Sequence, residues 1–244
     1  MKRLVIIAII SMIALSVSAQ DYLGIQFGYA QPTTRLNAPK TKTTLTPTSY
    51  NGFKVGLVYE AVVYKGFGVS LGLNYTFGAN ATDWLLSNGN PINSQDNNTP
   101  KYPQTSSKSF YHQLEIPIDW QYKFEIAKET WVIIYTGPTL QCGLAFNNKQ
   151  YKKDLQGVTL DKTNNLFSVD DMKDYALKRI NVTWGFGAGF QYQRYFLRGG
   201  YDLGIINPYK ASQFDQVVGQ GNPRTRGRFD QWQIKIGMYL WQSK

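Results

Sequence analysis

The sequence predicts an all-β fold, an eight-stranded antiparallel up-and-down transmembrane β-barrel. Apolar and polar residues alternate with a period of two through most of the chain, and the alternating segments are about ten residues or longer. That is the length of a tilted strand that crosses a bilayer. The connections between these segments are alternately long and short, as in outer-membrane barrels.

The hairpin from Ile180 to Ile205 shows the pattern most clearly. From Ile180 to Tyr192 the even positions are apolar or aromatic, whereas the odd positions are small or polar. The alternation resumes after Gln193 and Arg194. A period of two places the two sets on opposite faces of a sheet, so we expect two paired membrane-spanning strands here.

The other strands follow the same rule. They are expected at Leu23–Ala30, Gly52–Tyr64, Phe67–Phe77, His112–Phe124, Trp131–Phe146 and Phe229–Trp241. Short turns are expected at Lys65–Gly66, Ala127–Glu129 and Gln193–Arg194, and long loops at Gln31–Tyr50, Gly78–Ser109, Asn147–Lys178 and Asn207–Arg226. In a soluble lipocalin-like barrel the apolar face would point inward. Here the other face carries the charges, which favours lipid outside the barrel.

The first 19 residues are predicted to be a signal peptide. Lys2 and Arg3 precede an apolar run from Leu4 to Leu15, and the small residues Val17-Ser18-Ala19 form a cleavage site. Cleavage after Ala19 would leave residues 20–244 as the outer-membrane β-barrel domain. We therefore expect export by a cleaved signal peptide to the outer membrane of a Gram-negative bacterium.

Charge and composition limit the partners. The chain has 26 Lys and Arg against 16 Asp and Glu, and the basic residues lie mainly in the predicted loops. Nucleic acid is an unsuitable partner for an exported barrel, so we expect outer-membrane lipid and the phosphates of outer-membrane glycolipid. A solvated basic surface explains the same charge. The single cysteine, Cys142, cannot form an intrachain disulfide.

Eight charged residues fall on the inward face of the predicted strands. They are Lys54, Glu60, Glu115, Asp119, Lys123, Arg198, Asp202 and Lys235. Charges withdrawn from water need partners, and four bases against four acids predict a salt-bridged polar network inside the barrel. We expect the carboxylates of the strand His112–Phe124 to pair with Lys235 or Arg198.

Several motifs resemble the PorT-like outer-membrane β-barrel domain family. They are Leu114-Glu115-Ile116-Pro117, Tyr122-Lys123-Phe124, Tyr135-Thr136-Gly137-Pro138, Gly185–Phe190 and Arg198–Gly204. The resemblance runs from the first predicted strand to the last. It implies a barrel and, through the branch that names the family, an accessory role in a type IX-like protein secretion system. The chain departs from barrels that end on an aromatic residue, because Gln242-Ser243-Lys244 follow Trp241.

The sequence predicts no catalytic residue, no cofactor and no metal ion. His112 has nearby serines but no orienting acid, so a hydrolytic Ser–His pair is disfavoured. Asp170, Asp171 and Asp174 lack the spacing and glycine of a calcium loop. The glycines from Gly185 to Gly189 lack the spacing of a nucleotide-binding motif, and small residues relieve crowding inside a narrow barrel.

The long loops are the predicted functional parts, because they exceed what a hairpin needs. Candidate contact residues are Trp84, Leu85, Leu86, Leu166 and Phe167, apolar groups in otherwise polar segments. They either form a contact surface or cap the barrel mouth. We expect a non-enzymatic interaction or accessory component with a protein partner in secretion or envelope machinery. A small passive outer-membrane channel and a barrel hydrolase are the alternatives.

Overall fold

The computed structural model describes residues 20–37, 48–83, 85–86, 104–168, 176–209 and 226–243. Its strands are β1 (Gln20–Asn37), β2 (Thr48–Ser49), β3 (Asn51–Tyr64), β4 (Phe67–Ala81), β5 (Leu85–Leu86), β6 (Gln104–Ala127), β7 (Thr130–Asp154), β8 (Gly157–Asn165), β9 (Ile180–Tyr192), β10 (Tyr195–Gly204) and β11 (Arg226–Gln242). The predicted signal peptide lies outside the described residues.

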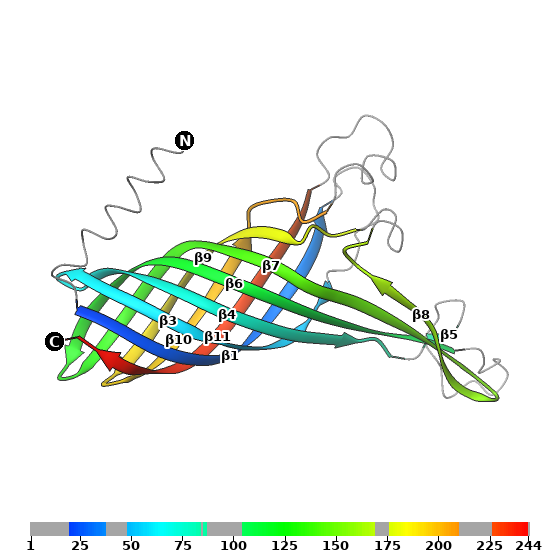
Figure 1. Ribbon diagram of the computed structural model, residues 1–244, viewed down its shortest axis with the longest axis horizontal. Coiled ribbons are helices and arrows are strands. Elements are labelled where there is room, and N and C mark those ends of the chain that lie inside the picture. Colours follow the sequence, from blue (N-terminus) through cyan, green and yellow to red (C-terminus); the bar gives the residue numbers. More distant parts are fainter. Residues whose placement is uncertain are drawn as a thin grey trace.

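The long strands pair antiparallel into a closed ring (Figure 1). Successive pairings run β1–β3–β4–β6–β7–β9–β10–β11, and β11 pairs again with β1. Asp21 and Ser243 close the end of the seam, because the Ser243 amide donates to the Asp21 carbonyl at 2.9 Å. The Asp21 amide in turn donates to Ser243 Oγ at 2.7 Å. The predicted antiparallel ring is confirmed, and the chain past Trp241 is part of the seam.

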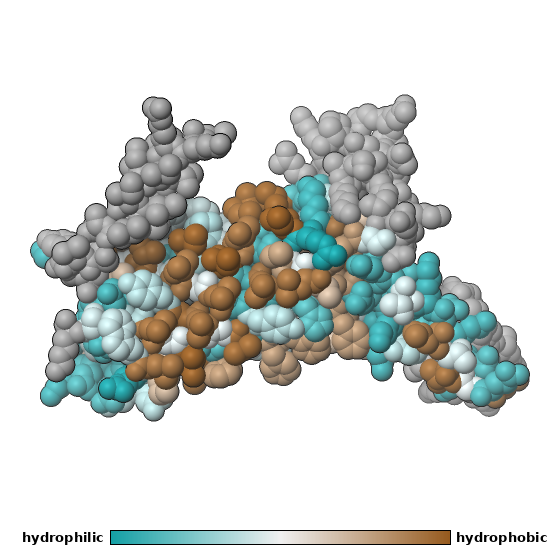
Figure 2. Space-filling view, viewed as in Figure 1, coloured by the Kyte–Doolittle hydropathy of each residue, from teal (hydrophilic) through white to brown (hydrophobic). Residues whose placement is uncertain are grey.

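The predicted orientation of the two faces is also confirmed. Apolar side chains of the ring strands are exposed outward, and Figure 2 shows them as a hydrophobic surface over the barrel wall. Charged and amide side chains of the alternate positions are buried inside. This arrangement is stable only where hydrocarbon covers the outer wall, because the exposed apolar side chains would otherwise contact water.

Short turns join the strands at one end of the barrel, at the predicted positions. Lys65 and Gly66 both have positive φ, 44° and 88°, as a tight two-residue hairpin requires. The Lys123 amide donates a hydrogen bond to the Gly66 carbonyl at 2.7 Å. A Cβ atom added to Gly66 would lie 1.9 Å from the Lys123 carbonyl oxygen. The turn therefore packs against β6 too closely for any larger residue.

Three of the predicted long loops are wrong in part, because strands extend into them. In the first, β1 continues to Asn37 and β2 lies at Thr48–Ser49. β6 begins at Gln104, β7 continues to Asp154, and β8 is a further strand paired with β7. We call Gln104–Ser109 together with Asn147–Asn165 the flap; in Figure 1 it projects with β5 beyond the end of the barrel opposite the short turns. Apart from the exposed Leu155, Val158 and Leu160, the flap is mostly polar, so its apolar alternation is too short to predict these strands.

Among the described residues, no apolar helix has the length that crossing a bilayer requires.

A folded ring predicts heat-modifiable electrophoretic mobility. The backbone ladder has no open edge around the ring, so unboiled protein in sodium dodecyl sulfate should keep its barrel and migrate differently from boiled protein. Paired gel lanes measure this. Identical migration, combined with solubility in the absence of detergent, would contradict the transmembrane barrel.

Candidate functional site

The interior of the barrel holds the eight charged residues that the sequence placed on the inward face. Each is at most 6% exposed. The ring strands project them into the lumen by their alternation. They form contacts at two levels, which we call the lower cluster, around Glu60 near the short turns, and the upper cluster, around Glu115.

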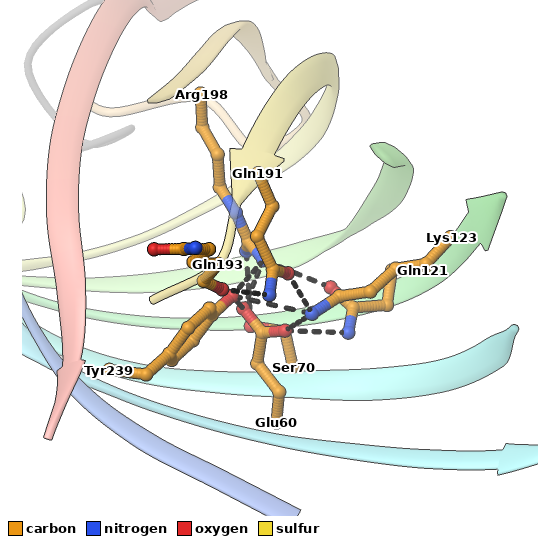
Figure 3. Close-up of polar contacts among 8 residues, drawn as sticks. All are labelled: Glu60, Ser70, Gln121, Lys123, Gln191, Gln193, Arg198 and Tyr239. Atoms are coloured by element: carbon orange, nitrogen blue, oxygen red, sulfur yellow. Dashed lines mark hydrogen bonds and ion pairs between the residues drawn. The ribbon is translucent and has the colours of Figure 1, made fainter. Parts of the chain in front are cut away.

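Glu60 on β3 is the centre of the lower cluster (Figure 3). Arg198 on β10 forms an ion pair with Glu60 Oε1, and Tyr239 on β11 donates to the same oxygen at 2.6 Å. On β6, Lys123 Nζ lies 2.5 Å from Glu60 Oε2, and Gln121 donates to that oxygen at 3.0 Å. One carboxylate therefore links strands from different sides of the barrel.

Aromatic rings close the lower cluster. Lys123 Nζ lies 4.4 Å from the ring centroid of Tyr22 and 5.0 Å from that of Tyr239. Tyr239 also packs on Phe196, with centroids 4.8 Å apart. Tyr22, Phe196 and Tyr239 are buried. The lower cluster thus fills the lumen with ion pairs and aromatic packing together.

The upper cluster is built around Glu115 on β6. Lys54 Nζ lies 2.5 Å from Glu115 Oε2 and donates to Gln233 Oε1 at 2.6 Å. Thr76 donates to Glu115 Oε1 at 2.8 Å, and Gln233 donates to Asp202 Oδ2 at 2.9 Å. The contacts connect β3, β4, β6, β10 and β11 across the lumen.

The predicted pairing partners are wrong. Glu115 pairs with Lys54, and Arg198 pairs with Glu60. Neither Asp119 nor Lys235 has an ion pair within 4.0 Å in the part of the chain that the structure describes. Barrel strands are tilted and staggered, so the position of a residue along its own strand does not give its height in the lumen.

An aromatic cap covers the mouth at the long-loop end. It consists of the buried residues Tyr50, Tyr111, Phe146, Leu166, Phe167 and Leu177. The Leu166 amide donates to the Phe146 carbonyl at 2.8 Å, and the Leu177 amide donates to the Leu166 carbonyl at 2.7 Å. These bonds fold the segment after β8 back over the barrel.

The structure describes four of the five candidate loop contact residues. Leu166 and Phe167 are 9% and 8% exposed, so their packing is that of a mouth cap, the second of the two roles considered. Their part in partner contact stays a prediction. Trp84 lies outside the described residues. Leu85 and Leu86 form β5, which pairs with β6 at Thr105 and Gln104.

A small cavity of about 40 Å³ lies beneath the cap. Asn181 donates to Gln141 at 2.8 Å, yet Gln141 Nε2, Asn181 Oδ1 and the Tyr111 hydroxyl have no hydrogen-bond partner within the described part of the chain. The alternation along the strands predicts that Gln141 and Asn181 face inward, but no motif in the sequence marks them as site residues. Buried polar groups of this kind are commonly satisfied by water, and the cavity has room for little more.

No group of three or more His, Cys, Asp or Glu in the described ranges could hold a metal ion. In the two clusters, the carboxylates of Glu60 and Glu115 face lysine, arginine, amide and hydroxyl donors. What the geometry does is fill and brace the lumen.

Glu60→Gln should destabilise the barrel strongly. The substitution leaves Arg198 and Lys123 buried without their shared carboxylate, and breaking a buried pair in this way costs about 3–5 kcal/mol. Guanidinium unfolding in detergent micelles, followed by tryptophan fluorescence, measures the change. Glu125→Gln, an exposed acid on the same strand as Lys123, is the control. Equal unfolding free energies for the two variants would contradict a bracing role for Glu60.

The chain was also compared with known proteins. Ail from Yersinia pestis, in complex with the heparin analogue sucrose octasulfate, is 10% identical over 92% of this chain and 100% of its own, with a TM-score of 0.39. Neisserial surface protein A is 10% identical over 89% of this chain and 97% of its own, with a TM-score of 0.37. The N-terminal β-barrel domain of Pseudomonas aeruginosa OprF is 11% identical over 87% of this chain and 97% of its own, with a TM-score of 0.28. No curated protein matches the chain. A family model described as the outer membrane protein beta-barrel domain matches residues 18–209, so this chain belongs to that family of outer-membrane β-barrels.

Proposed function

We propose that the protein is a non-enzymatic recognition component of the Gram-negative outer membrane, exported by a cleaved signal peptide. A braced barrel holds the flap outside the membrane, and the flap engages a partner in the envelope. The observation that carries the proposal is the contrast between a lumen crossed by the ion pairs of Glu60 and Glu115 and a mostly polar sheet that projects beyond the barrel.

The filled lumen favours recognition over transport. Paired charges cross the lumen at two levels, and an aromatic cap covers one mouth. Eight-stranded barrels have interiors only wide enough for side chains. An ion would have to displace Lys54, Lys123 or Arg198 from its carboxylate, at a cost of several kcal/mol. A passive channel is therefore the less favoured function.

The flap is an exposed, basic surface. The last residue of β4, Ala81, pairs with Lys108, whereas the β6–β7 ladder continues to Gln104 and Lys153. The flap carries five lysines and two aspartates. Outer-membrane barrels place their long connections outside the cell and their short turns in the periplasm. The flap then faces the cell exterior, with a positive charge suited to anionic partners.

The resemblance to PorT-like barrels supplies the partner class on the protein side. An accessory role in a type IX-like secretion system would use the same flap and cap as the docking surface. We include this role in the proposal as one identity of the partner, beside outer-membrane glycolipid.

Purified protein should give no steady conductance in planar bilayers. The reason is the side-chain filling of the lumen, and single-channel recording is the measurement. The Glu60→Gln variant, if it folds, tests whether the lower cluster is the barrier. Stable openings of the unaltered protein would favour the passive channel instead.

Removing the outer part of the flap should abolish partner binding without unfolding the barrel. Asn148 and Asn164 are paired across β7 and β8, so a Gly-Asn turn can replace residues 149–163 and leave the cap segment at Leu166 in place. Affinity capture from mildly solubilised outer membranes should then recover fewer partners. A deletion strain carrying the shortened gene should also fail in any secretion that the full-length protein restores.

The heat-shift gel verifies that the shortened barrel folds. Lys128→Ala, at the opposite end of the barrel, serves as a surface-charge control. Retention of all partners and full complementation by the shortened protein would show that the flap is dispensable and that the proposal is wrong.

A further inference from the structure

The flap contains a hollow of about 330 Å³, which we call the flap hollow. Its lining includes Thr82, Thr105, Ser107, Gln150, Tyr151 and Asp161. The volume is within the range of small-ligand sites, whereas the cavity under the cap is far smaller. Every residue of this lining carries a hydroxyl, amide or carboxylate group beside its apolar atoms, so a ligand rich in hydrogen-bonding groups would fit.

An irregularity in strand pairing shapes the hollow. On β7, Gln150 pairs with Lys162 and Tyr151 pairs with Leu160, so Asp161 is an extra residue opposite no partner. A β-bulge of this kind redirects a side chain and is common beside functional sites. At the other side Thr82 fixes the wall, because the Ser107 amide donates to Thr82 Oγ1 at 2.9 Å.

Two polar side chains of the flap hollow are free to form hydrogen bonds with a ligand. The side chains of Gln150 and Asp161 are exposed and make no hydrogen bond to another part of the described chain. Gln150 offers two donors and an acceptor, and the Asp161 carboxylate accepts only. A sugar ring with adjacent hydroxyls can donate to the carboxylate and exchange bonds with the amide at the same time.

Two lysines add positive charge on the same face. Residues opposite each other in an antiparallel ladder share a face. Lys152 lies opposite Thr105, and Lys162 lies opposite Gln150, both of which line the hollow. Both lysines are exposed, and neither has an ion pair within 4.0 Å among the residues that the structure describes. Two cations around one carboxylate leave the face net positive.

We propose that the flap hollow binds an anionic, hydroxyl-rich saccharide, with sugar hydroxyls on Gln150 and Asp161 and a phosphate or carboxylate of the sugar beside Lys152 and Lys162. The inference rests on the proposed recognition function and names the ligand class of the flap. The same chemistry occurs in the headgroup of an outer-leaflet glycolipid and in free acidic polysaccharide. A protein partner of the flap would bind elsewhere on it.

Titration calorimetry of the full-length protein in detergent tests the site with four probes. They are lipopolysaccharide, the phosphorylated oligosaccharide freed from its lipid, the same oligosaccharide after dephosphorylation, and inorganic phosphate. The phosphorylated oligosaccharide should bind more tightly than the dephosphorylated one, and its affinity should fall as salt rises, because exposed charges are screened. Inorganic phosphate should bind too weakly to compete.

Point variants locate the site. Gln150→Ala should weaken the oligosaccharide about fivefold to tenfold, the equivalent of about one hydrogen bond. Lys152→Gln with Lys162→Gln should remove the preference for the phosphorylated form and the salt dependence. Lys128→Ala should leave both unchanged. Lipopolysaccharide that binds with the same pattern of losses, while the free oligosaccharide does not bind, would identify a lipid-borne ligand of the proposed class.

Two results would overturn the inference. One is that the hollow variants bind every probe as the unaltered protein does, which would place lipopolysaccharide on the barrel wall. The other is competition by inorganic phosphate at the oligosaccharide's own concentration, which would show simple anion attraction. In either case, loss of partners on removing residues 149–163 would still support the flap as a recognition surface, so the two proposals fail separately.

Discussion

Closure of the backbone ladder is the constraint on which the rest of this structure depends. Inside a bilayer every backbone amide and carbonyl needs a partner, and an antiparallel ring supplies one only if its last strand returns to its first. Here β11 pairs with β1 along nearly its whole length, and Ser243 with Asp21 completes the seam. A closed ring of so few strands leaves a lumen that side chains must fill.

Ion pairs and hydrogen bonds between polar side chains hold the interior of the barrel together. Glu60 and Glu115 each collect donors from several strands, so cross-lumen bonds replace the apolar core of a soluble domain. Charges in such a place stabilise only when they are paired and hydrogen-bonded. The same bonds that brace the wall fill the lumen with side chains.

The sequence alone predicted the barrel, because the information for it is local. A period of two fixes which side chains face lipid and which face the lumen, and a pair such as Lys65-Gly66 fixes where the chain reverses. Their odd or even positions along the strands predict that the eight charged residues face inward, and all eight are buried in the lumen. The flap strands escaped prediction, because their residues are mostly polar and the alternation of Val158 and Leu160 on β8 is too short to indicate a strand.

Only the tertiary structure decided which groups meet. The pairing of Glu60 with Arg198, the burial of Leu166 and Phe167 in the cap, and the position of Asp161 in the flap hollow all depend on strand tilt and register. A shift of one residue between neighbouring strands changes every cross-lumen distance, while the composition of each strand stays the same. The residues of each strand therefore determine what faces inward, and the stagger of the closed ring determines what each inward group touches.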